Sequence, residues 1–372
     1  MRRKRTLPPA VVEAHVQFTF GRGFEDSWGS MSRMRGKIRK LATRLGILLT
    51  GAWLLAGCAG LSDTMAPEDP IDVRRSAIAT ELLIEAARVG RLDMVEVALS
   101  HGAEPDAGEP ETGRTALMLA ARGGFPQVIE ALSASHANLD AVDAEGWTAL
   151  MHAAARDRRT ALLPLLAAGA DLDMREARYG YTALMVAAML GNVDAAATLL
   201  DRGADVDETT SGGTTPLILA AASSSHRAPV AVAELIVRGA DVNDSRGDGF
   251  TPVMAAAAAG NVTSLNLLLG RGADPAARTL AGFDALGLAA GLGQAEAVAV
   301  LIDAGVDPDA PQSPQGDTPL MLAASRGHMD VVATLLRHGA DPAVQRVDGA
   351  TAIDLAQASG EFAVAALLGA SH

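Results

Sequence analysis

The sequence has one cysteine and few aromatic residues, and each shortage excludes a class of structure. One cysteine among 372 residues excludes an intramolecular disulfide, a zinc site built from several thiolates and a CxxC redox motif. Aromatic residues make up 3% of the chain, although hydrophobic residues make up 49%. The interior must therefore be built mainly from Ala, Leu, Val and Met, which suits closely packed helices.

Positive charge is scarce beyond the N-terminus. The first 57 residues hold 11 of the 31 Lys and Arg and three of the 44 Asp and Glu, and no lysine follows Lys40. The rest of the chain therefore has 20 basic and 41 acidic residues, a net charge of −21, whereas the whole chain has −13. A general nucleic-acid-binding protein needs a basic face, so we expect no nucleic-acid partner.

Residues 34–57 have the order of a secretory signal. A basic stretch from Arg35 to Arg44 is followed by about a dozen apolar residues and then by small residues. The apolar run is shorter than the roughly 20 residues of a membrane-spanning helix. We expect Met31 or Met34 to be the true start of translation, because residues 1–33 have no place in such a signal.

The end of this segment, Leu55-Ala56-Gly57-Cys58, resembles the lipobox of bacterial lipoproteins. The resemblance implies that diacylglycerol is attached to the Cys58 thiol, that the chain is cleaved before Cys58 and that the new N-terminus is acylated. Ala59, in place of Asp, implies sorting to the outer membrane. The alternative interpretation is that Cys58 is a buried thiol in a hydrophobic helix.

The signal divides the chain into four predicted parts. They are an upstream mis-start or disordered extension (1–33), the signal peptide (34–57), a lipidated flexible tether (58–75) and a repeat domain (76–372).

The repeat domain has a period of 33 to 36 residues. The pattern Thr-Pro/Ala-Leu-X-X-Ala-Ala recurs, with Asp284 once in place of Thr, and Gly-Ala-Asp or a close variant follows about 21 residues later. With an earlier copy that begins at Glu81, this makes nine units. The repeat threonines are Thr115, Thr148, Thr182, Thr215, Thr251, Thr318 and Thr351.

Each unit predicts two short helices. The threonine caps the first helix, and a glycine such as Gly124 or Gly260 ends it in a left-handed conformation. A second helix follows, and Gly-Ala-Asp then turns the chain into a hairpin-like loop. No unit can bury its own apolar face, but stacked units can.

This period and motif resemble the ankyrin repeat over about residues 81–370. The resemblance implies an all-α solenoid of about nine helix-turn-helix repeats joined by hairpin-like loops, and non-catalytic protein binding. The family's His after Thr-Pro-Leu is mostly Met here, so we expect thioether packing in place of its hydrogen bonds. Two further departures are Ser135-His136-Ala137 in place of Gly-Ala, and 156–159 where a helix-ending glycine is expected.

Motifs for catalysis or metal binding are absent. The sequence has no HExxH, GxSxG or P-loop pattern. Acidic pairs such as Asp171/Asp173 and Asp307/Asp309 lie in the repeat's own turns and lack the glycine and distal Glu of a calcium loop. We interpret them as turn residues that bond local backbone amides, and we expect no enzyme activity, no cofactor and no metal.

The residue before each repeat threonine is expected near a loop tip. Four of the seven aromatic residues after Cys58 share this position, and a fifth lies two residues from it. Aromatic anchors are the usual energetic centres of an interface, so we predict partner contact, with stiffening of the array as the alternative. The candidates are Trp147, Tyr179, Tyr181, Phe250 and Phe283.

Arg88, Arg122 and Arg156, near the ends of successive first helices, form a second candidate site. They indicate either a docking patch for an acidic partner or a solvated face that balances the acids.

Together these patterns predict a monomer with a lipid anchor on the periplasmic face of the bacterial outer membrane. Its expected role is to bind a protein of unknown identity, as a scaffold or protective factor for a periplasmic protein. The alternative role is an inhibitor or immunity protein that neutralises an envelope-acting toxin or enzyme.

Overall fold

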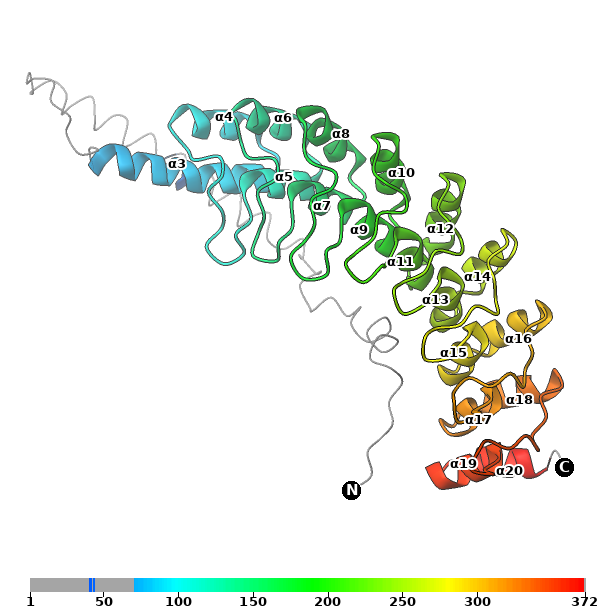
Figure 1. The fold of residues 1–372 in the computed structure, drawn as a ribbon. Coiled ribbons are helices and arrows are strands. Elements are labelled where there is room, and N and C mark those ends of the chain that lie inside the picture. The colour runs from blue at the N-terminus through cyan, green and yellow to red at the C-terminus, as the bar shows by residue number, and fades with distance from the viewer. Residues whose placement is uncertain (1–39, 42, 44–69, 371–372) are drawn as a thin grey trace, which may run out of the picture. The chain divides into compact units, whose positions relative to one another are not determined.

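The computed structural model describes residues 40, 41, 43 and 70–370 (Figure 1). In this part of the chain 18 helices follow one another as nine pairs, and the β-structure is limited to one isolated bridge between Gly108 and Thr115. The predicted all-α array of paired helices is therefore confirmed. Apart from residues 40, 41 and 43, the predicted signal peptide lies outside the described residues, and so do Cys58 and most of the tether. None of the described helices is long and apolar enough to cross a membrane.

The described chain divides into two compact units. The N-terminal unit comprises residues 70–187 and 194–204, and the C-terminal unit comprises residues 188–193 and 205–370. The first four pairs are α3 (Pro70–Arg88) with α4 (Leu92–Ser100), α5 (Ala116–Gly123) with α6 (Pro126–Ala134), α7 (Ala149–Ala154) with α8 (Arg159–Ala168), and α9 (Ala183–Leu190) with α10 (Val193–Asp201), which lies at the boundary.

The remaining five pairs belong to the C-terminal unit. They are α11 (Pro216–Ala222) with α12 (Ala228–Val237), α13 (Pro252–Ala259) with α14 (Val262–Leu269), α15 (Ala285–Gly291) with α16 (Ala295–Asp303), α17 (Pro319–Ala324) with α18 (Met329–Arg337), and α19 (Ala352–Ser359) with α20 (Phe362–Gly369).

The predicted caps begin the first helices. In α5 the Thr115 Oγ1 atom accepts a hydrogen bond from the Met118 N–H, and Asp284 accepts one from the Gly287 N–H at 2.9 Å. The last repeat differs, because there the Asp354 carboxylate accepts hydrogen bonds from the N–H and hydroxyl of Thr351. Thr caps of the same kind begin α7, α9, α11, α13 and α17.

The core consists of first helices packed on first helices and second helices on second helices. In the N-terminal unit α5 packs on α7 and α6 on α8, and in the C-terminal unit α13 packs on α15 and α16 on α18. Methionine fills the position that carries His in the family, and the Sδ atoms of Met118 and Met321 lie 3.5 Å from the backbone N of their cap threonines. In these two repeats the buried sulfur therefore also accepts a hydrogen bond from the N–H of the cap threonine. The five methionines, each at most 1% exposed, are Met118, Met151, Met185, Met254 and Met321.

Left-handed residues end the first helices as predicted, with φ of 79° at Gly124 and 67° at Gly260. Two residues other than glycine have positive φ in the described chain, His136 (60°) and Asp157 (53°). They stand at 135–137 and at 156–159, the two turns where the sequence lacks the expected glycine. The stacking of repeats therefore imposes this backbone conformation even where a Cβ disfavours it.

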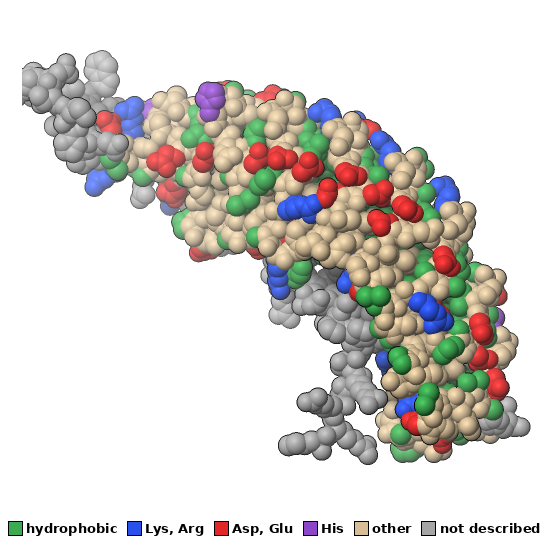
Figure 2. Space-filling model, in the orientation of Figure 1, with side chains coloured by type: hydrophobic (Ala, Val, Ile, Leu, Met, Phe, Trp, Pro, Cys, Tyr) green, Lys and Arg blue, Asp and Glu red, His purple; other side chains and the backbone are tan. Residues whose placement is uncertain are grey.

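The acidic turns form a ladder of hydrogen bonds within each unit. Asp171 Oδ1 accepts a bond from the N–H of Asp173 in its own turn at 2.8 Å, and Asp140 Oδ1 accepts one from the Asp171 N–H of the next repeat at 2.9 Å. The C-terminal unit repeats this arrangement, for example from the Asp341 N–H to Asp309 at 3.0 Å. These bonds confirm the interpretation as turn residues. In the N-terminal unit Figure 2 shows acidic side chains gathered over these turns.

Candidate binding surface at the loop tips

The tips of the hairpin-like loops touch one another in sequence order. In the N-terminal unit the Ala144 N–H donates to the Thr112 carbonyl at 2.9 Å. The next pair of tips is also in contact, because a Cβ added to Gly146 would come within 2.7 Å of the Ala177 nitrogen. The tips 109–114, 143–147 and 175–181 therefore form one continuous surface, which we call the tip row.

A buried carboxylate organises the middle tip. Asp143 Oδ1 accepts hydrogen bonds from the N–H groups of Glu145 and Trp147, both at 2.9 Å. Asp143 Oδ2 accepts from His152 Nε2 at 2.8 Å and from Arg114 Nε at 3.4 Å. The half-buried Trp147 ring lies 5.5 Å from the His152 ring, between ring centroids. One side chain thus fixes both the loop backbone and the indole.

Burial decides the charge of this pair. Burial lowers the pKa of His152 below its ordinary value, the Asp143 carboxylate offsets this only in part, and Arg114 and Arg122 lower it further. Burial alone would raise the pKa of Asp143, but hydrogen bonds from His152 and the Trp147 N–H outweigh it and hold that pKa below its ordinary value. At neutral pH a neutral imidazole therefore donates to an ionised carboxylate.

This pair gives a pH prediction for the N-terminal unit. As the pH falls from neutrality through the ordinary His pKa of about 6.5, residue 152 takes up a proton in the unfolded chain. In the folded chain it stays neutral over this range, because its pKa is lower. The unfolded state holds more protons there, so the free energy of unfolding should fall as pH falls. Asp143, with its lowered pKa, acts in the same direction in more acidic solution. Urea denaturation at a series of pH values from 8 to 5 measures how the free energy of unfolding depends on pH. This dependence should be weaker for His152→Gln than for the parent, and an unchanged dependence would contradict the assignment.

The next tip carries two stacked tyrosines. Glu176, 5% exposed, accepts hydrogen bonds from the N–H groups of Arg178, Tyr179 and Tyr181. The two tyrosine rings lie 5.3 Å apart between centroids with 24° between their planes, and the Arg178 guanidinium lies 4.9 Å from the Tyr179 ring centroid. Tyr179 is 41% exposed and Tyr181 is half-buried. This tip is a rigid aromatic platform with a cation beside it.

The other two predicted aromatic anchors lie in the C-terminal unit. Phe250 is 3% exposed, and its ring centroid lies 5.5 Å from the Arg246 guanidinium carbon, so its ring belongs to the packing of the array. We therefore leave Phe250 out of the binding surface. Phe283 is half-buried. The search for aromatic residues missed two exposed apolar residues at loop tips, Leu280 (85% exposed) and Val347 (83% exposed). A search for any apolar residue at a loop tip would have found them.

Of the predicted arginines, Arg88 pairs with Glu109 and lies 3.6 Å from Glu85, so its charge is neutralised within the fold. Arg122 and Arg156 are half-buried at the ends of α5 and α7.

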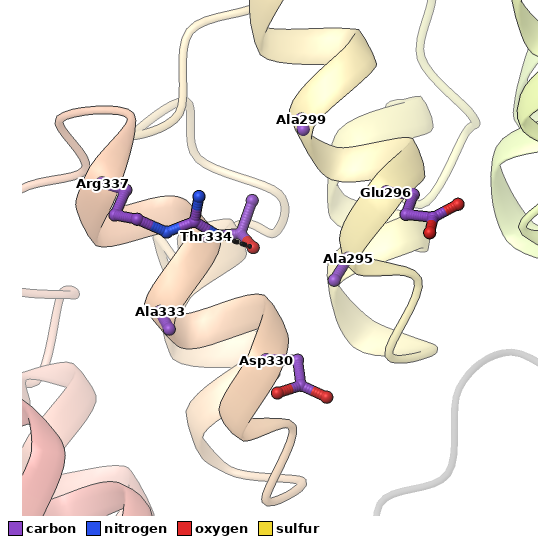
Figure 3. A pocket seen from close by; sticks show the side chains of 7 residues that line it. All are labelled: Ala295, Glu296, Ala299, Asp330, Ala333, Thr334 and Arg337. Atoms are coloured by element: carbon purple, nitrogen blue, oxygen red, sulfur yellow. Dashed lines mark hydrogen bonds between the residues drawn. The ribbon is translucent and has the colours of Figure 1, made fainter.

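A cavity of about 400 Å³ lies away from the tips, between α16 and α18 (Figure 3). Ala295, Ala299 and Ala333 line it, and Arg337 Nη2 donates to Thr334 Oγ1 at 2.9 Å at one end. Glu296 and Asp330 complete the lining. This open groove contains none of the residues predicted from the sequence. In the described residues no group of His, Cys, Asp and Glu has the arrangement of a metal site.

Comparison with known families supports the repeat assignment. A family model for ankyrin repeats, which spans three copies, matches the chain in overlapping blocks that together cover residues 83–372. The blocks are 83–176, 128–210, 155–244, 184–279, 224–312 and 286–372. A search of curated proteins gave no significant match.

Proposed function

Because the chain belongs to the ankyrin-repeat family, we propose that it is a non-catalytic module that binds a protein partner through the tip row of its N-terminal unit. Trp147, Tyr179 and Tyr181 are the proposed contact residues. The observation that carries this proposal is the tyrosine stack, which Glu176 holds in place beside the Trp147 loop.

The geometry of the tips suits an interface. Tyr, Trp and Arg are the residues that most often dominate binding energy, and the tip row presents all three. The buried carboxylates of Asp143 and Glu176 fix the loops before binding, so little conformational entropy is lost when a partner docks.

The binding proposal is tested by the variant Trp147→Ala/Tyr179→Ala/Tyr181→Ala in the Cys58→Ser chain, used as bait for envelope proteins identified by mass spectrometry. If each ring contributes as an interface hot spot, the variant should bind the captured partner at least about 100-fold more weakly. Phe362→Ala is the matched control, because Phe362 is an exposed aromatic (73%) in α20 of the other unit. Equal capture by the triple variant, with an unchanged helical signal, would refute the proposal.

For its location, we propose that Cys58 carries a lipid and anchors the protein to the periplasmic face of the outer membrane as a monomer. The support is the sequence alone: a basic stretch, a short apolar run, and Leu55-Ala56-Gly57-Cys58. Cys58→Ser should prevent processing and release the protein from the sedimented outer membrane. Normal processing and membrane retention of this variant would refute the anchor.

Within this setting we propose a scaffold or protective factor for a periplasmic protein. The alternative is an inhibitor or immunity protein against an envelope-acting toxin or enzyme. One tight partner whose binding is lost with two or three aromatic residues would favour the inhibitor. Small losses spread over many repeats would favour the scaffold.

A further inference from the structure

The groove between α16 and α18 is hollow because alanines stand along it. Ala295 is the first residue of α16, and α14, the preceding second helix, has Val262 there. Ala299 is the fifth residue of α16, where α14 has Asn266, and Ala333 is the fifth residue of α18. Figure 3 shows Ala295 and Ala299 on the edge of α16 that faces α18. These short side chains leave the free space of about 400 Å³, which is in the size range of binding pockets.

One end of the groove carries an acid without an ion-pair partner. Asp330 is the second residue of α18, and its side chain lies on the α16 side, whereas Glu296 turns away from α18 (Figure 3). Within the described chain Asp330 forms no ion pair, although Asp93, at the same position of α4, pairs with Arg91 at 2.7 Å. An acid in the first turn stabilises a helix. The Asp330 charge nevertheless stays open to a ligand in the groove.

The other end of the groove carries a base that is held in place. Arg337 is the last residue of α18, and its Nη2 atom donates to Thr334 Oγ1 at 2.9 Å (Figure 3). Thr334 is 5% exposed, so this bond holds the guanidinium group back over the helix. A guanidinium group has five N–H donors, and the described residues offer Arg337 no carboxylate. Its positive charge thus lies beside Thr334, four residues after Asp330, which is about 6 Å along the helix axis.

We propose that this groove binds a short extended segment of a protein partner in which a Lys or Arg and an Asp or Glu stand two residues apart. In an extended chain such side chains point to the same side, about 6.5 Å apart, which matches the spacing of the two charges in the groove. The basic group of the segment pairs with Asp330, and its carboxylate forms charge-assisted hydrogen bonds with Arg337. The aliphatic stem of the basic side chain covers the alanines.

The charges of the groove select the kind of segment. A purely acidic segment is repelled by Asp330 and a purely basic one by Arg337, so a segment that carries both charges fits best. The groove belongs to the C-terminal unit and shares no residue with the tip row, so each proposal can fail without the other.

The probe is a peptide with Lys-Ser-Asp flanked by glycines, blocked at both ends and labelled with a fluorophore that has no net charge. The peptide is neutral, so the charge of −21 after Gly57 does not attract it non-specifically. It is titrated with the Cys58→Ser chain and followed by anisotropy. It should bind at low salt, and binding should weaken as salt is added. A Gln-Ser-Asn peptide is the control and should bind at least about fivefold more weakly.

Two variants test the space and the charge of the groove. Ala299→Leu/Ala333→Leu fills the groove without changing any charge, and leucine is almost as good a helix former as alanine. It should bind the Lys-Ser-Asp peptide at least about tenfold more weakly, because the segment no longer fits. Asp330→Asn should also weaken binding at least about tenfold. Asp194→Asn removes an acid from the same position of α10 and should bind like the parent.

Arg337→Gln and Asp330→Asn change exposed side chains, so they keep the test valid if the leucine variant loses its helical signal. Three results would overturn the proposal: no binding of the Lys-Ser-Asp peptide by the parent at low salt, parent-like binding by a folded leucine variant, or equal weakening by Asp194→Asn and Asp330→Asn.

Discussion

Asp143→Ala is expected to lower the free energy of unfolding of the N-terminal unit by about 3 kcal/mol or more, because it removes a buried carboxylate that accepts several hydrogen bonds. Asp143 has a side chain only 1% exposed, and it accepts bonds from two backbone N–H groups, His152 and Arg114. Alanine would leave these donors without their acceptor in a site that excludes water.

The loss of free energy of unfolding can be measured by urea denaturation with Trp147 fluorescence as the probe, because Trp147 is the one tryptophan after Gly57. Asp143→Asn is the matched control, since its amide oxygen can still accept the two loop N–H bonds. It should cost clearly less than alanine. A loss below about 1 kcal/mol for Asp143→Ala would show that the carboxylate does not organise the loop.

Gly146→Ala is expected to destabilise the same unit by about 2 to 3 kcal/mol, for two reasons. Gly146 has a φ of 82°, a conformation that costs an L-residue about 1–2 kcal/mol. Its new Cβ would also lie 2.7 Å from the Ala177 backbone nitrogen, so the tyrosine tip would have to move. We therefore expect weaker partner capture together with lower stability.

Gly169→Ala separates the two causes. Gly169 also has a positive φ, of 98°, but a Cβ there would meet no atom within 4 Å. It should show the cost of backbone strain alone, by denaturation, and leave partner capture unchanged. Equal losses for both variants would mean that contact between neighbouring tips contributes little.

The sequence predicts the fold well because the same local signals for the start and end of a helix recur in successive repeats. Thr115 and Thr251 cap first helices, and Gly124 and Gly260 end them, through local backbone chemistry that does not depend on the rest of the chain. The two turns that lack the expected glycine also mark strained backbone, because His136 and Asp157 have positive φ there.

The site was predicted less completely because burial depends on the neighbouring repeat. The position before the repeat threonine gives both Trp147 and Phe250, but Phe250 is buried at a tip whose Gly249 lies against 278–280. Glu176 carries no motif that distinguishes it from a solvated acid, and only the folded loop shows that it accepts hydrogen bonds from three backbone N–H groups of the tyrosine tip.

The row of buried methionines has a consequence for how the array responds to oxidants. A thioether can be oxidised to a sulfoxide only when the oxidant reaches sulfur, and Met118, Met151, Met185, Met254 and Met321 are shielded. Brief treatment with peroxide would therefore modify each one in proportion to how often its own repeat opens. Because a sulfoxide is polar, the first such event would hinder reclosure of that repeat and expose its neighbours. Oxidative damage should then spread along the array from its least stable repeat, and peptide masses would record the order.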